Sequence, residues 1–171
     1  MKKKNKKKGI LFWITGLSGA GKTSLANEIK KDIKKKFGPT LVINGDDLRK
    51  IFKLNKYDKS SRLEYTKQYS QFVKFITNQG VNVIFTVVGL FDRIRTWNRK
   101  NINNYVEIFI RTNVSKIKKK RKKRIYLRKT NEIVGIQIKP EFPKRPDIII
   151  NNDFKKSIRQ LSAVLIKKII K

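Results

Sequence analysis

The stretch that most constrains this chain is Gly16–Thr23, which reads G-L-S-G-A-G-K-T. Two glycines around four residues, followed by Lys-Thr, form a phosphate-binding loop pattern, because glycines let backbone N–H groups turn toward a polyphosphate. The apolar run Ile10–Ile14 enters the loop as a buried strand does, and the helix-forming run Ser24–Lys36 leaves it. A phosphate would then lie on a helix N-terminus. The alternative is a glycine-rich turn of an ordinary α/β protein; we predict that the chain binds a nucleoside triphosphate.

Each residue type in this loop has an expected part in binding ATP. Lys22 reaches the β- and γ-phosphates, and the Thr23 hydroxyl ligates Mg²⁺. The residues that we expect at the nucleotide are Gly16, Ser18, Gly19, Ala20, Gly21, Lys22, Thr23 and Ser24.

The composition narrows the chemistry that the chain can use. It has 171 residues, which predicts one domain over 9–171 after a basic, disordered tail at 1–8. It has no cysteine and no histidine, so disulfides, thiolate catalysis, Cys/His zinc sites and a histidine base are excluded. The net charge of +32 indicates either an anionic partner or a solvated surface from a coding sequence biased toward Lys, Asn and Ile.

The amino-terminal residues imitate a signal peptide, because MKKKNKKK precedes the apolar GILFWITGL. The apolar part is too short and runs directly into the phosphate loop, so we reject that interpretation. No stretch of about twenty apolar residues follows, so we expect no membrane span and a cytoplasmic protein.

Apolar strands alternate with helical segments along the chain, which predicts an α/β fold with a parallel five-stranded sheet flanked by helices. The expected strands are Ile10–Thr15, Thr40–Asn44, Val81–Val88, Tyr105–Ile110 and Asp147–Ile150. The expected helices are Lys22–Lys36, Leu48–Phe52, Ser60 or Ser61 to about Asn78 with Glu64 at capping-box distance, Ile94–Asn101, Val114–Arg124 and Phe154–Lys171. Residues 124–145 lack a clear period and are predicted to form a mobile flap. The last helix is basic and amphipathic, which suits either packing on the sheet or lying on a membrane.

Asp46 and Asp47 directly follow the second predicted strand, which we expect to lie beside the phosphate loop. A kinase needs a carboxylate there to accept or orient the proton of the attacking hydroxyl. The alternative is a helix N-cap that complements the helix dipole. Arg49 lies one helical turn beyond Asp46 and suits bidentate binding of an acceptor's phosphate.

Several motifs in order resemble the adenylylsulfate kinase family from about Leu11 to Asp147. The family's aspartate-glycine-aspartate-x-x-arginine motif resembles Asn44–Arg49, and its arginine-x-glutamate-asparagine motif resembles Arg62–Tyr65. Its lysine-glycine-leucine-tyrosine flap motif resembles Lys123–Tyr126. Its closing motifs resemble Val134–Ile136, Glu141–Pro143 and Pro146-Asp147. The resemblance implies a three-layer P-loop nucleotide-kinase fold and a homodimer.

The resemblance also implies roles for individual residues. Asp46 matches the catalytic aspartate, acting beside Lys22. Arg49 and Arg62 match arginines that hold the acceptor nucleotide, and Tyr57 stands where an aromatic ring packs on its base. Lys123 matches a flap lysine near the phosphates. Without the resemblance, the alternative interpretation of Arg62 and Lys123 is that they are solvated surface charges.

The departures from the family pattern fall on the acceptor side. Asn44 replaces the first aspartate of its motif, which weakens a metal role there, and Tyr65 replaces the base-contacting asparagine. Val88-Gly89-Leu90 replaces isoleucine-serine-proline after the third strand, which leaves Val88 and Gly89 at the acceptor. The residues for the phosphate donor are kept, so we expect the same reaction on a different small nucleotide.

Three functions remain open at this point. The first is transfer of the γ-phosphoryl group of ATP to the ribose 3′-hydroxyl of cytidine diphosphoramidate, the acceptor of a family branch in capsule-polysaccharide pathways. The second keeps the reaction and restores adenylyl sulfate as acceptor. The third is an ATP-gated nucleic-acid-binding protein, which rests on charge alone because no RNA-binding motif is present.

Overall fold

The computed structural model describes residues 8–121 and 132–170. The strands are β1 (Leu11–Thr15), β2 (Thr40–Asn44), β3 (Asn82–Val87), β4 (Tyr105–Arg111) and β5 (Ile148–Asn151). The helices are α1 (Lys22–Phe37), α2 (Gly45–Ile51), α3 (Lys59–Asn78), α4 (Asp92–Asn101), α5 (Val114–Arg121) and α6 (Ile158–Ile170).

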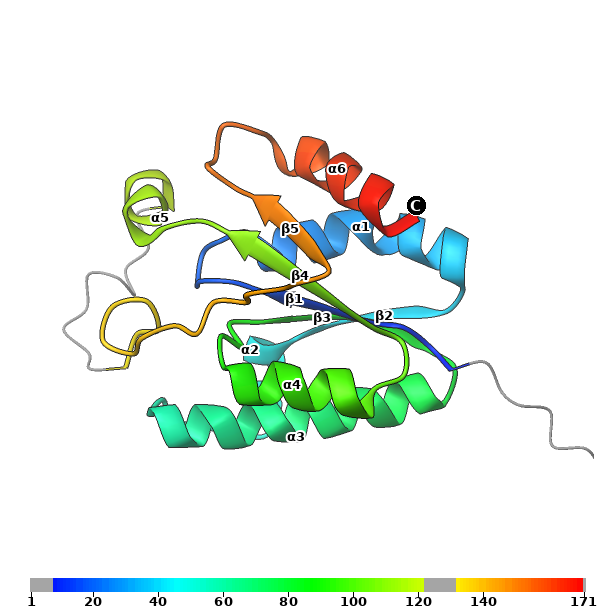
Figure 1. Cartoon of the computed structure of the whole chain (residues 1–171), viewed down its shortest axis with the longest axis horizontal. Coiled ribbons are helices and arrows are strands. Elements are labelled where there is room, and N and C mark those ends of the chain that lie inside the picture. Colours follow the sequence, from blue (N-terminus) through cyan, green and yellow to red (C-terminus); the bar gives the residue numbers. More distant parts are fainter. Residues whose placement is uncertain (1–7, 122–131, 171) are drawn as a thin grey trace, which may run out of the picture.

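The five strands form one parallel sheet in the order β2-β3-β1-β4-β5. Helices α1 and α6 cover one face, and α3 and α4 cover the other (Figure 1). The carboxyl ends of the strands meet at one edge, where α2, α5 and the segment before β5 also gather (Figure 1). The predicted three-layer α/β fold with a parallel five-stranded sheet is confirmed.

The central strand β1 is buried on both faces, which explains its unbroken apolar sequence. Phe12 and Ile14 pack in the cluster beneath α1 and α6. Leu11 and Trp13 pack in the cluster beneath α3 and α4, where the Trp13 ring stacks on Phe85 with centroids 4.9 Å apart. A strand held between two cores gives the loop that follows it a rigid base.

Two expectations about the region after β2 are wrong. β3 lies between β1 and β2, so Asp46 and Asp47 are one strand further from the phosphate loop than predicted. Helix α2 also begins at Gly45 rather than Leu48, which places both aspartates in its first turn. Carboxylates are favourable there because the exposed N–H groups of a helix N-terminus attract negative charge.

The start of α3 also differs from the prediction. Its N-cap is Asp58, one carboxylate oxygen of which accepts the Ser61 N–H at 2.9 Å while the other accepts the Ser61 hydroxyl at 2.7 Å. The predicted cap at Ser60 or Ser61, with Glu64 completing it, is therefore wrong. Asp58, which precedes both expected caps, satisfies the backbone N–H groups that are free at the start of a helix.

The closing helix begins at Ile158 rather than Phe154. Phe154 has a positive φ of 66° and packs with a different cluster from the rest of the predicted stripe. Ser157 and Gln160 form a reciprocal capping box, in which each side chain accepts the backbone N–H of the other at 3.2 and 2.9 Å. Leu161 and Leu165 are buried against the sheet side, so α6 packs as the last layer of the fold.

The predicted tail and flap lie partly outside the described residues. Of the tail, Lys8 is described, and of the flap, residues 132–145 are. In that part Val134 and Ile138 form an isolated bridge, and Glu141 donates its backbone N–H to the Leu90 carbonyl at 3.0 Å. Within the described ranges, no helix has the length and apolar character needed to cross a membrane.

Candidate functional site

The phosphate loop connects β1 to α1 and takes its shape from backbone contacts. Gly16 has a φ of +152°, and a Cβ atom there would lie 2.7 Å from the Ile110 carbonyl oxygen, so a side chain would push the loop off β4. The Lys22 ammonium donates to the carbonyls of Gly16 and Leu17 at 2.9 Å each. Gly21 is the N-cap of α1 and has no side chain, so it leaves the first N–H groups of that helix uncapped. The loop is thus built to receive an anion.

A buried asparagine fastens this loop to the end of β5. Asn152 is 3% exposed, and its side-chain amide donates to the Ala20 carbonyl at 2.9 Å. Its side-chain oxygen accepts the Phe154 N–H at 3.0 Å. The positive φ of Phe154 belongs to this turn, which holds the asparagine under the loop.

A cavity of about 610 Å³ opens at the carboxyl edge of the sheet. Its walls bring together Lys22 and Thr23 of the loop with Asp46 and Arg49 of α2 and Arg62 of α3. This volume lies within the range of about 300–1,000 Å³ that is typical of small-molecule sites.

The two neighbouring aspartates of α2 differ in their surroundings. Asp46 lines the cavity, whereas Asp47 is engaged by the Asn44 amide, which donates to it at 2.8 Å. The Asn44 oxygen in turn accepts the Thr86 hydroxyl at 2.6 Å. The Asn44 side chain therefore bridges β3 and α2 and engages Asp47, whereas the Asp46 carboxylate lines the cavity.

Two arginines supply positive charge opposite the phosphate loop. Arg49 donates to the carbonyls of Leu54 and Lys56 at 2.9 and 2.8 Å. Arg62 donates to the carbonyls of Tyr57 and Glu132 at 2.5 and 2.9 Å. Both guanidinium carbons lie close to the Tyr57 ring, at 4.4 Å for Arg49 and 5.2 Å for Arg62 from its centroid, so the two cations are near enough to repel. Burial and the neighbouring Arg49 charge accordingly lower the pKa of Arg62. An anionic ligand between them would relieve that repulsion.

Two aromatic residues that were predicted at the acceptor lie near these arginines. Tyr57 lines the cavity, and its ring centroid lies 4.4 Å from the Arg49 guanidinium carbon. Tyr65 also contacts Arg49, at 5.2 Å, but is not part of the cavity wall. In this structure both rings hold the arginine by cation–π contact.

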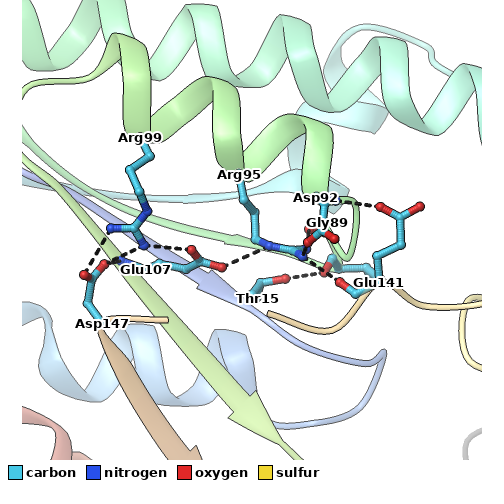
Figure 2. Close-up of polar contacts among 9 residues, drawn as sticks. Thr15, Gly89, Asp92, Arg95, Arg99, Glu107, Glu141 and Asp147 are labelled. Carbon is cyan, nitrogen blue, oxygen red and sulfur yellow. Dashed lines mark hydrogen bonds and ion pairs between the residues drawn. The ribbon is translucent and has the colours of Figure 1, made fainter. Parts of the chain in front are cut away.

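The loop after β3 forms a further part of the cavity wall. Val88 and Gly89 both line the cavity. The Thr15 hydroxyl donates to the Val88 carbonyl at 2.5 Å (Figure 2). Gly89 has a φ of +45°, and a Cβ atom there would lie 2.7 Å from a Val87 methyl carbon and 3.3 Å from the Trp13 ring. The residue that stands in place of the family's serine is therefore required to be glycine by local packing.

Most predicted site residues meet at this cavity. Those that line it are Ser18, Gly19, Gly21, Lys22, Thr23, Ser24, Asp46, Arg49, Tyr57, Arg62, Val88 and Gly89. Gly16 and Ala20 are buried beneath the loop and shape it instead. Lys123 lies outside the described residues.

Sequence reasoning missed several residues of the site. Thr66, Tyr69, Ile133 and Val134 also line the cavity, and Asn152 holds the loop. Thr66 and Tyr69 follow Arg62 at helical spacing, so the α3 face that carries Arg62 indicates them in retrospect. Asn152 lies just after the fifth predicted strand, at the edge where ligands gather.

The donor set suits a metal that keeps most of its water. Thr23 is exposed on the cavity wall in the first turn of α1. Among the described residues no three of His, Cys, Asp and Glu cluster as a metal site. Mg²⁺ commonly binds one or two protein oxygens and completes its shell with water and substrate phosphates, so the residues present fit it.

A glycine-rich loop after the central strand of a parallel sheet, opening on a cavity with a carboxylate and two arginines, defines the class of P-loop kinases. The family model for adenylylsulphate kinase matches residues 8–151, so the chain belongs to that family. It is a phosphotransferase that acts on a hydroxyl group.

Two relatives and one solved structure show how this chain compares with known proteins. It is 31% identical over 163 residues to the cytidine diphosphoramidate kinase of Campylobacter jejuni, covering 93% of this chain and 95% of that protein. It is 29% identical over 148 residues to the adenylyl-sulfate kinase of Pseudomonas aeruginosa, covering 82% and 76%. It shares its fold with the APS kinase of Mycobacterium tuberculosis in complex with AMPPNP and APS, with a TM-score of 0.83, 24% identity and coverage of 96% and 99%.

Proposed function

We propose that the protein transfers the γ-phosphoryl group of ATP to the ribose 3′-hydroxyl of a small nucleotide, and that this nucleotide is cytidine diphosphoramidate. The observation that carries the reaction is that one cavity is lined both by Lys22 and Thr23 of the phosphate loop and by Asp46, Arg49 and Arg62 of α2 and α3. Donor and acceptor sites must share one space for in-line transfer.

The proposed chemistry assigns a step to each charged group. Asp46 accepts the proton of the ribose 3′-hydroxyl as its oxygen attacks the γ-phosphorus, and the bond to the β-phosphate oxygen breaks to release ADP. Lys22 stabilises the charge that develops on the phosphoryl oxygens. Thr23 would hold Mg²⁺, which supplies further charge neutralisation when bound. Lys123 would contribute from the flap.

Arg49 and Arg62 are proposed to hold the anionic part of the acceptor. Their guanidinium groups are held by backbone carbonyls of the α2–α3 connection and of Glu132, so they are positioned before the acceptor arrives. Tyr57 is proposed to contact the acceptor's base.

The choice of cytidine diphosphoramidate rests on sequence similarity and on the altered acceptor side. The similar protein of Campylobacter jejuni carries that name, and this chain covers 95% of it. Tyr65, in place of the family's asparagine, packs on Arg49 and leaves no amide to contact an adenine. A role in capsule polysaccharide modification in the cytoplasm follows from this acceptor. Adenylyl sulfate is the second candidate, because relatives with that activity by name match over most of the chain.

The test is ADP release by the purified protein with Mg·ATP and either acceptor in parallel. We expect a kcat/KM at least tenfold higher with cytidine diphosphoramidate than with adenylyl sulfate, and a 3′-phosphorylated product by mass spectrometry. Lys22→Ala serves as the inactive control. The reverse preference would assign the second acceptor, and release with neither would defeat the proposal. Light scattering of the same sample checks the expected homodimer.

A nucleic-acid-binding function has no support beyond the net charge. Membership of the kinase family accounts for the phosphate loop and the cavity without it.

A further inference from the structure

A buried ionic cluster between α4 and the sheet lies outside the residues assigned to catalysis (Figure 2). Its centre is Arg95, which is 4% exposed and pairs through Nε with Glu107 of β4 at 3.0 Å. Glu107 is also 4% exposed and receives a second contact from Arg99 at 3.0 Å. Burying these charges is costly unless they are well paired, so the cluster needs a reason beyond packing.

Arg95 points its remaining N–H groups toward two loops of the cavity (Figure 2). One terminal nitrogen donates to the Gly89 carbonyl at 3.2 Å, and the other donates to the Glu141 carbonyl at 2.7 Å. The second nitrogen also pairs with Asp92. A single side chain thus contacts the loop after β3 and the segment before β5.

These two loops are joined to each other as well. The Glu141 backbone N–H donates to the Leu90 carbonyl at 3.0 Å, and the Glu141 carboxylate accepts the Asp92 N–H at 2.7 Å. Val88 and Gly89 of the first loop line the acceptor side of the cavity, and so do Ile133 and Val134, which precede Glu141 in the second. Arg95 therefore joins two segments that each contribute residues to the cavity wall.

We propose that Arg95, oriented by Glu107, is a positioning residue that fixes both loops so that the acceptor site is formed before the acceptor binds. This rests on the proposed function for the identity of the site. Arginine suits the task because its planar group donates in several fixed directions at once, which a lysine does not. In the described part of the chain, the hydrogen bonds and ion pairs of Arg95 go to Gly89, Asp92, Glu141 and Glu107 and none to the phosphate loop, so the effect should separate acceptor binding from ATP binding.

Arg99 provides a matched control. It lies one turn further along α4, carries the same charge and contacts the same Glu107. Its second ion-pair partner is Asp147, at 3.2 and 3.1 Å, and its guanidinium carbon lies 5.3 Å from the Tyr105 ring centroid. Within residues 8–121 and 132–170, the hydrogen bonds of Arg99 go to Asp147 and Glu107 and not to either cavity loop, so Arg99 shares the cluster without bonding to the wall.

The experiment compares Arg95→Lys and Arg99→Lys in steady-state kinetics with whichever of the two acceptors the wild type uses. We expect Arg95→Lys to raise the KM for the acceptor about tenfold while the KM for ATP changes less than twofold. Arg99→Lys should leave both KM values within about twofold. Glu107→Gln should shift the acceptor KM in the same direction as Arg95→Lys, and it provides a second variant if the first folds poorly.

Hydrogen–deuterium exchange on the unliganded proteins provides a readout that needs no acceptor. We expect faster amide exchange in 88–92 and 132–142 in Arg95→Lys, with 16–24 unchanged and Arg99→Lys like the wild type. Equal exchange in the two lysine variants, or an equal rise of both KM values in Arg95→Lys, would overturn the proposal. If the wild type used neither acceptor, the proposed function would fail while the exchange result still decided whether Arg95 fixes the loops.

Discussion

The two halves of the cavity are built in different ways. The phosphate loop is one continuous stretch whose shape depends on its own glycines, on β1 and on the Asn152 amide. The acceptor half is assembled from α2, the start of α3, the loop after β3 and the segment before β5, which meet through side chain to carbonyl bonds. The first half is fixed by local sequence, and the second by contacts between residues far apart in the chain. We therefore expect a change of acceptor to need changes at several separate places and none in the phosphate loop.

The variant with the largest expected effect on this contrast between the two halves of the cavity is Arg62→Ala. Arg62 is proposed to bind the acceptor and not ATP, so its loss should raise the acceptor KM about 10- to 100-fold, the scale of losing a charge-assisted hydrogen bond. The KM for ATP should change less than twofold in the same kinetic series. Lys67→Ala, which removes an exposed cation from the same helix, is the control. An equal rise for ATP would mean that the two halves are not separate.

A smaller effect is expected from Asn152→Ala, which tests the phosphate-loop half. The change leaves the Ala20 carbonyl without its donor in a buried place and should lower the free energy of unfolding by about 1–3 kcal/mol. The melting temperature should fall, and the KM for ATP should rise while the acceptor KM holds. Asn151→Ala, at the exposed neighbouring position, should leave both measurements unchanged. A rise in the acceptor KM alone would contradict the separation of the cavity into a phosphate-loop half and an acceptor half.

The smallest effect concerns the Asp58 cap, which begins the helix that carries Arg62. The Ser61 backbone N–H, with help from the Ser61 hydroxyl, holds the pKa of Asp58 below its ordinary value of 3.8. A carboxylate with a lowered pKa stabilises the fold fully above pH 3.8, and that contribution is lost as the pH falls through the folded-state value.

Asp58→Ala should therefore lower the melting temperature by about 2–4 °C near pH 7. The difference from the wild type should shrink as the pH is lowered below 3.8, measured by calorimetry across a pH series. Ser60→Ala, which removes an exposed hydroxyl beside the cap, should show no such trend. A difference that stayed constant with pH would argue against the charge of Asp58 as its source.

The sequence predicted the sheet and the phosphate loop well because both depend on short-range patterns. An apolar run such as Ile10–Ile14 is typical of a strand buried on both faces, and the glycines around Lys22 predict the loop directly. The strand order, in contrast, does not depend on a short-range pattern. Nothing near Asn44 shows that β3 lies between β1 and β2, and the aspartates were for that reason placed too close to the loop.

The helix starts show how small polar residues decide boundaries. Asp58 and Ser157 each satisfy the free N–H groups of a helix, and each displaces the expected start by one to four residues. The apolar spacing of a helix does not reveal which of several polar residues provides the cap.

The acceptor half was predicted from its individual residues but not from their contacts. Arg49 and Arg62 were expected to face an acceptor, and both line the cavity. Their carbonyl partners, and the connection from Arg95 to Glu141 across 46 residues of chain, depend on tertiary packing that no local pattern encodes. Tyr65 shows the same limit, because its contact with Arg49 was not predicted.

The most direct test of the central claim is single-turnover phosphoryl transfer by Asp46→Asn beside Asp47→Asn. The two carboxylates are adjacent in the first turn of α2, but Asp46 lines the cavity and Asp47 is held by Asn44. We predict that Asp46→Asn lowers the transfer rate by about 10²–10⁴-fold, while a fluorescent ATP analogue still binds with unchanged affinity. Asp47→Asn should keep most of the rate. Full activity in Asp46→Asn would contradict the account.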